Sequence, residues 1–144
     1  MTTPRRLLTC RPSSSCSYLA ARRAELDLSD ANPSAALARL EPWLGEEAPT
    51  RIHDVMLLST AAEACLALGD VDRGEHLVDR ALRRAAATRN QIDGIDAQRV
   101  KARCHLLRGR RSEARECLDE ALSRASALPY PSGRARIQLA LDEV

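Results

Sequence analysis

The chain has 144 residues, and its 22 basic and 20 acidic side chains leave a net charge of only +2, which excludes a strong overall field that would recruit nucleic acid. No run of about 18 or more apolar residues is present, so no segment is expected to span a membrane. Phe is absent and Ala and Leu supply most of the 44% hydrophobic content; because both favour helices and no stretch alternates with a period of two, we expect an all-α chain.

Residues 1–15 are expected to form a disordered basic leader, since they carry three Arg, two Pro and a run of Ser but no acidic residue. A lipoprotein export signal would need an apolar region of about 7–15 residues before its cysteine. Here Leu7 and Leu8 are the only large apolar residues between the arginines and Cys10. We therefore expect a soluble cytoplasmic protein with reduced cysteines.

Seven amphipathic helices are predicted in chain order after the leader. Apolar residues recur at spacings of three and four, as do Val55, Leu58 and Ala62 in the third helix. Gly and Pro punctuate the series, with Pro33 suited to a first helical turn and Gly69 to a helix end. The predicted helices cover residues 16–28, 34–45, 51–68, 72–88, 91–108, 112–127 and 132–143.

The helices form an internal repeat. Residues 51–88 align with 91–128 at an offset of 40, and the matching residues are mainly small or apolar. A weaker copy lies upstream at an offset of 38. A period of this length with two helices per unit predicts antiparallel helical hairpins stacked as an α-solenoid. We expect one domain over 16–144, with units at about 16–49, 50–89 and 90–129 and a partial unit at 130–144.

The residues that recur in the two clearest units have a characteristic spacing. They are Ala62, Leu66, Gly69, Gly74 and Ala81 in one unit and Ala102, Leu106, Gly109, Ala114 and Ala121 in the next. This ladder resembles the tetratricopeptide repeat family, although the units are longer than the family's usual ~34 residues and its aromatic positions hold Leu, Val, Cys or His. The long, Ala/Arg/Leu-rich units, with the junction Leu128-Pro129-Tyr130-Pro131, are similar to repeats in bacterial transcriptional regulators.

The resemblance implies a non-catalytic protein–protein interaction scaffold, serving as a regulatory or sensor module of such a regulator. By the family's geometry, first helices would line a groove that binds a protein or peptide partner. The groove residues so implied are Met56, Ser59, Glu63, Asp96, Arg99 and Arg103. Arg99 and Arg103 would hold an acidic segment of the partner, or pair within the chain with Glu63 or Asp96.

The segment Gly69-Asp70-Val71-Asp72-Arg73-Gly74-Glu75 resembles a calcium-binding loop in its closely spaced acidic residues and glycine. Counted from Asp70, however, the fifth loop position is Gly74 and the twelfth is Ala81, so two of the required oxygen ligands are missing. We expect Asp70 and Asp72 to cap the next helix instead. Neither a metal site nor a cofactor is predicted.

Two alternative functions stay open from the sequence. The first is a thiol-based enzyme or sensor using Cys104, although Cys104 and His105 point about 100° apart on a helix and no catalytic motif supports this reading. The second is a DNA-linked regulator acting on its own, for which interleaved acids and the lack of exposed aromatics predict a solvated arginine face instead. The last helix has an apolar stripe, from which we expect self-association or membership of a longer regulator.

Overall fold

The computed structural model describes residues 14–45 and 53–144, and within these ranges the chain is entirely helical apart from its turns. The all-α class predicted from composition is therefore confirmed. The α-helices are α1 (Ser14–Ser29), α2 (Pro33–Leu40), α3 (Asp54–Ala67), α4 (Val71–Thr88), α5 (Gln91–Leu107), α6 (Arg111–Ser126) and α7 (Pro131–Asp142), and a short 3-10 turn, η1 (Glu41–Trp43), follows α2.

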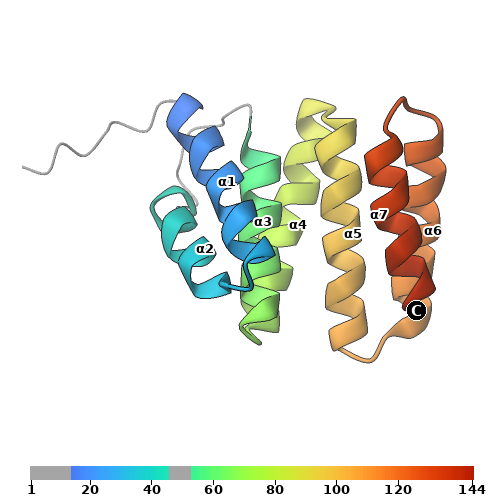
Figure 1. Cartoon of the computed structure of the whole chain (residues 1–144). Helices are drawn as coiled ribbons and strands as arrows, with labels where there is room; N and C mark the ends of the chain where they lie inside the picture. Colours follow the sequence, from blue (N-terminus) through green and yellow to red (C-terminus); the bar gives the residue numbers. More distant parts are fainter. Residues whose placement is uncertain (1–13, 46–52) are drawn as a thin grey trace, which may run out of the picture.

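Successive helices pack as antiparallel hairpins, α1 with α2, α3 with α4 and α5 with α6, and α7 packs against both α5 and α6. The first helices form one continuous layer, because α1 contacts α3, α3 contacts α5 and α5 contacts α7. Figure 1 shows α4 and α6 behind this layer. The result is the stacked-hairpin solenoid expected from the repeat.

Glycine ends two of the first helices. Gly69 and Gly109 adopt φ angles of +85° and +75° after α3 and α5, the left-handed conformation that closes a helix most readily at glycine. The Asp70 amide then donates to the Cys65 carbonyl at 2.9 Å, and the Arg110 amide donates to the His105 carbonyl at 2.8 Å. Both turns therefore have the same geometry one repeat apart.

The two acids of the apparent calcium loop have other partners. The Asp70 side chain caps α4 by accepting a hydrogen bond from the Arg73 amide at 3.2 Å. The Asp72 carboxylate accepts one from the Arg108 guanidinium at 2.6 Å. Asp70 thus starts a helix, as predicted, while Asp72 joins α4 to the end of α5.

Among the residues that the structure describes, the hydrophobic core forms two clusters that meet at α5. Ala97, Val100 and Cys104 of α5 belong to the cluster built from α1 to α4. Ile95 and Ala102 belong to the cluster built with α6 and α7. Helix α5 therefore carries apolar side chains on two faces, which joins the two halves of the solenoid.

Two expectations about helix extent change. The second helix was expected over 34–45, but α2 ends at Leu40 because Pro42 lacks an amide hydrogen and its ring would clash with the preceding helical turn. The predicted leader falls mostly on residues 1–13, which lie outside the described part of the chain, and α1 already includes Ser14 and Ser15. None of the helices that the structure describes combines the length and apolar character needed to cross a bilayer.

Most of the apolar stripe on the last helix is used within the chain. Ile137 is buried, and Ala140, Leu141 and Val144 pack against the second core cluster. Leu139 is the large apolar residue of α7 that remains exposed. The structure therefore gives this helix an internal packing partner in α6, and self-association through it stays an untested prediction.

Candidate functional site

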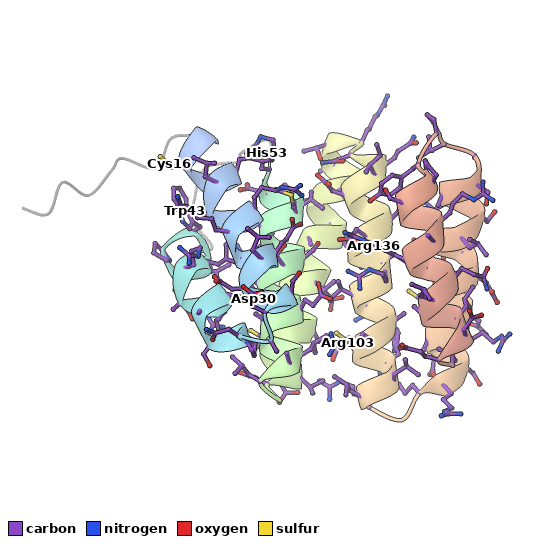
Figure 2. The ribbon with its side chains drawn as sticks, viewed as in Figure 1. Cys16, Asp30, Trp43, His53, Arg103 and Arg136 are labelled. Carbon is purple, nitrogen blue, oxygen red and sulfur yellow. The ribbon has the colours of Figure 1, made fainter. Side chains whose placement is uncertain are left out.

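An open groove of about 650 Å³ runs across the layer of first helices. All four of these helices contribute to it, with α1 and α7 forming its two sides and α3 and α5 its floor. Its lining residues are Arg22, Glu25, Leu26, Leu28, Ser29, Thr60, Glu63, Asp96, Arg99, Arg136, Leu139, Ala140 and Glu143. Figure 2 shows Arg103 and Arg136 along this face.

The structure brings together part of the residue set predicted for the groove. Glu63 of α3 meets Asp96 and Arg99 of α5 on the groove floor. Arg103 lies just beyond them, with its guanidinium 3.7 Å from the Glu63 carboxylate. Met56 is half-buried in the packing between helices and does not line the groove.

Ser59, also predicted to face the groove, is buried. Only 3% of it is exposed, and its hydroxyl donates to the Val55 carbonyl of the same helix at 2.8 Å. A serine hydroxyl that is bonded to its own helix in this way has no free donor for a ligand. The neighbouring Thr60 lines the floor instead, although its hydroxyl likewise donates to its own helix, to the Met56 carbonyl at 2.8 Å.

Arg99 organises the charges of the groove floor. Its two terminal nitrogens donate to the two carboxylate oxygens of Glu63 at 3.3 and 3.4 Å, and its Nε donates to Asp96 at 3.0 Å. Burial alone would lower the pKa of the Arg99 guanidinium, but the carboxylates of Asp96 and Glu63 outweigh it and raise that pKa. The intramolecular pairing considered from the sequence is therefore present for Arg99.

A further carboxylate lies at the side of the floor. Burial raises the pKa of the Glu25 carboxyl, and although Arg22 lowers it, the Asp96 and Glu63 carboxylates raise it further. Arg22 of α1 donates to Glu25 at 2.8 Å, and Arg136 of α7 reaches Asp96 at 3.8 Å. Each of these carboxylates therefore has an arginine neighbour, and the charges of the floor are balanced within the chain.

Sequence reasoning missed the sides of the groove, although the repeat contained a signal for one of them. Arg136, Leu139 and Glu143 stand 40 residues after Asp96, Arg99 and Arg103, and all three line the groove. Extending the repeat register by one more period would have found them. The α1 side gave a weaker signal, because the upstream copy follows an offset of 38 and shares fewer residues.

Cys104 and Cys117 are placed as packing residues. Cys104 is fully buried, and burial raises the pKa of its thiol to about 11. Burial likewise raises the pKa of Cys117 to about 11, and its thiol donates to the Gln98 carbonyl at 3.3 Å. Thiols with such pKa values are protonated at neutral pH and are weak nucleophiles. The geometry therefore disfavours the thiol-based alternative.

Several arginines of the proposed solvated face are also engaged within the chain. Arg80 donates to the Leu44 carbonyl at 2.9 Å, and Arg84 lies 3.8 Å from Asp54. Arg108 pairs with Asp72 and Glu75. These arginines stabilise contacts between helices, which reduces the cationic surface available to DNA.

Comparisons with known proteins find solved structures with a similar fold. No protein-family model matches the chain, and no curated protein matches it significantly. A crystal structure of PcrH, in complex with the chaperone-binding region of PopB, matches at 15% identity with a TM-score of 0.67, covering 91% of this chain and 98% of PcrH. A TPR-like protein from Chlorobium tepidum matches at 19% identity with a TM-score of 0.68, covering 89% of this chain and 91% of its own. The chain thus has a tetratricopeptide-like fold of stacked helical hairpins.

Proposed function

We propose that this protein is a non-catalytic interaction scaffold that binds a segment of a partner protein in the groove across α1, α3, α5 and α7. The observation that carries the proposal is the pair of exposed leucines in that groove. Leu26 and Leu139 are 64% and 66% exposed, although each belongs to a helix with a well-packed opposite face. Exposed apolar residues gathered in a concave surface are typical of a binding site.

The fold supports the same use of the groove. In the crystal structure of PcrH, a protein of similar fold is in complex with a region of another protein. The charge pairs of the groove floor are held by helices from both halves of the solenoid, so a ligand would meet a largely preformed surface. A preformed surface lowers the entropic cost of binding a segment.

The wider role we propose is the regulatory or sensor module of a bacterial transcriptional regulator, acting in the cytoplasm. Its support is the Ala/Arg/Leu-rich composition of the long units and the junction Leu128-Pro129-Tyr130-Pro131 before the last helix. In this role the groove would receive a segment of another regulatory protein, and no residue of the chain would act as a catalyst.

The test is capture of partners from a lysate of the source cells by variants of the purified chain. We expect Leu26→Asp with Leu139→Asp to abolish capture of the specific partners, because two carboxylates would stand where the apolar contacts form. Leu68→Asp with Leu107→Asp is the matched control, since these leucines are exposed outside the groove. Captured proteins would be identified by mass spectrometry, and circular dichroism would verify the helical content of each bait.

The proposal would be wrong if the groove variant captured the same proteins as the wild-type chain. It would also be wrong if the control variant lost them to the same extent, because the interaction surface would then lie elsewhere. A bait that loses helical content would be replaced by the milder pair Leu26→Ser and Leu139→Ser, read against Leu68→Ser and Leu107→Ser.

A further inference from the structure

A second cavity lies where α4, α5 and α6 meet, and we call it the junction pocket. Its volume is about 240 Å³, below the roughly 300–1,000 Å³ of sites for drug-sized ligands, so it has room for a small molecule. Within the described part of the chain, no residue lines both this pocket and the groove. The residues that line the junction pocket are Leu82, Ala85, Ala86, Arg89, Asn90, Gln91, Gly94 and Arg124.

The charged side chains of the junction pocket all have the same sign. Arg89 at the end of α4 and Arg124 of α6 line it, and no carboxylate is among its described lining residues. The neighbouring Asp93 carboxylate lies outside the lining and accepts a hydrogen bond from the Asn90 amide at 2.7 Å. The groove, by contrast, is lined by four carboxylates and three guanidiniums. Charge complementarity therefore selects an anion for the junction pocket, whereas it selects nothing for the groove.

Both arginines keep donors for a ligand. The Arg89 side chain makes no hydrogen bond or ion pair with the residues that the structure describes. Arg124 donates through Nη1 to the side-chain oxygen of Gln98 at 2.9 Å, and Gln98 is only 7% exposed. Since a guanidinium carries five N–H donors, this bond leaves Nη2 and Nε of Arg124 available.

Arg124 is oriented toward the pocket before any ligand arrives. Its bond to the buried Gln98 fixes one edge of the guanidinium. A Cβ built on Gly94, which also lines the pocket, would lie 3.7 Å from Nη2 of Arg124. The free edge of this guanidinium therefore lies at the pocket wall, and a preoriented group lowers the entropic cost of binding.

The remaining wall of the pocket is largely apolar. Leu82, Ala85 and Ala86 of α4 contribute aliphatic side chains, and Gly94 of α5 contributes bare backbone. A Cβ on Gly94 would approach the Ala85 Cβ to 3.1 Å, so the glycine lets the two helices meet closely at this wall. A ligand would thus find two cations next to an apolar surface.

We propose that the junction pocket binds a small organic acid, with its carboxylate between Arg89 and Arg124 and its apolar body against Leu82 and Ala85. Arginine suits this use because it holds a carboxylate through two parallel hydrogen bonds. The apolar wall favours an organic acid over an inorganic anion, since removing apolar surface from water adds to the affinity. The site would give the chain a small-molecule input, and it does not depend on what the groove binds.

The experiment titrates the full chain with three probes and follows proton–nitrogen NMR correlation spectra. Benzoate carries a carboxylate and an apolar body, benzyl alcohol the apolar body alone, and inorganic phosphate the charge alone. We expect benzoate to shift the amide signals of Gln91 and Gly94 and the Nε–H signal of Arg124 saturably, with a dissociation constant of about 1 mM or lower. The other two probes should bind at least roughly tenfold more weakly, because each lacks one of the two contacts.

Arg89→Asn with Arg124→Gln should weaken benzoate binding at least roughly tenfold, because both cations are lost. Asparagine tolerates the left-handed φ of +55° at Arg89, and glutamine keeps an amide donor for Gln98. Arg83→Gln with Arg115→Gln is the matched control, since it removes the same charge at exposed positions of α4 and α6 outside the pocket. This control should bind benzoate within about twofold of the wild-type chain.

A further variant leaves both arginines in place. Ala86 is exposed and lines the pocket, so Ala86→Glu would put a competing carboxylate beside Arg89 and Arg124. Benzoate binding should again weaken at least roughly tenfold. A thermal melt of each variant would establish that it is folded.

Several results would overturn the proposal. Undiminished benzoate binding in both pocket variants would place the binding site elsewhere. Equal binding of benzyl alcohol would show that the arginines recognise no anion, and equal binding of phosphate with the same shifts would reject an organic acid in favour of an inorganic anion. If no probe shifted the pocket signals saturably up to tens of millimolar, the site would be rejected, while the lysate capture would still decide the function of the groove.

Discussion

At the scale of single residues, Cys104 and Cys117 have the properties of packing residues and not those of reactive thiols. Both have a pKa raised to about 11 by burial, so the folded chain keeps them protonated where an unfolded thiol with a pKa of 9.0 ionises. As the pH rises, thiol deprotonation therefore lowers the free energy of the unfolded state before it lowers that of the folded state. The contribution of these protonated thiols to the stability of the fold is complete below pH 9 and is lost as the pH rises through about 11.

We therefore predict that the free energy of unfolding falls between pH 9 and 11, by up to about 2 kcal/mol for the fully buried Cys104. Lys101 contributes in the same direction, because its pKa is also raised in the fold. The thiol share is isolated by Cys104→Ala with Cys117→Ala, which should show a smaller fall in urea titrations across this range. An identical fall in both proteins would show that the thiols ionise freely in the folded chain.

At the scale of helices, the turns after α3 and α5 have the same backbone geometry, but the helices that follow them are capped differently. After Gly69, the side chain of Asp70 caps α4. After Gly109, Arg110 occupies the corresponding position of α6 and its side chain makes no capping hydrogen bond. An acidic side chain at the N-cap accepts a hydrogen bond from a free amide and interacts favourably with the positive end of the helix dipole. The cap can therefore be removed at Asp70 and introduced at Arg110.

Asp70→Ala should destabilise the protein by about 1 kcal/mol, because one amide of the first turn of α4 loses its acceptor. Arg110→Asp should stabilise it by about 0.5–1 kcal/mol, because it supplies the missing cap next to Glu113 in the same first turn. Urea unfolding followed by circular dichroism would measure both changes. The capping account would be contradicted if Arg110→Asp lowered the stability.

Helix positions were predictable because their signals are local. Glycines with positive φ ended α3 and α5 where expected, and a Cβ on Gly74 would approach the Leu66 side chain to 2.7 Å, so the small residue there marks a close helix contact. The early end of α2 was missed because Trp43 and Leu44, which come after Pro42, continue the helical spacing of the apolar residues before it. The spacing of apolar residues does not show that proline lacks the amide hydrogen needed to continue a helix.

The groove was predictable only in part because its contacts depend on how repeats stack. The pairing of Arg99 with Glu63 joins residues 36 positions apart, and sequence reasoning placed both on the same surface. It could not tell that Thr60 rather than Ser59 lines the groove, since both are buried and the hydroxyl of each donates to a carbonyl of its own helix. A rotation of less than a third of a helical turn decides between them, and only packing fixes that rotation.

The solenoid as a whole is held together at α5, which contributes to both core clusters. The junction also carries charge. The Lys101 ammonium of α5 lies 2.9 Å from both the Glu75 and Asp79 carboxylates of α4, and the Lys101 hydrogen bond is the main reason that the pKa of Glu75 is lowered. In repeat proteins, such contacts between neighbours couple the unfolding of adjacent units.

Lys101→Met should therefore weaken the link between the two halves. Removing the ammonium leaves two facing carboxylates without their shared partner, which we expect to cost about 1–3 kcal/mol in the free energy of unfolding. The loss should be complete above pH 4.5 and shrink as the pH falls below it, because the lowered pKa of Glu75 stabilises the fold only while that carboxylate is ionised. Arg83→Met, at an exposed position of α4, serves as the control for losing a cation.

Hydrogen exchange resolved by helix would distinguish a local from a global effect. Because α6 and α7 contact the rest of the chain chiefly through α5, a weaker α4–α5 junction should let the C-terminal half open at a lower free energy than α3 and α4. Uniform loss of protection over all helices would mean that the chain unfolds as one cooperative unit. Unchanged protection would show that the apolar faces of α5 hold the halves together without help from Lys101.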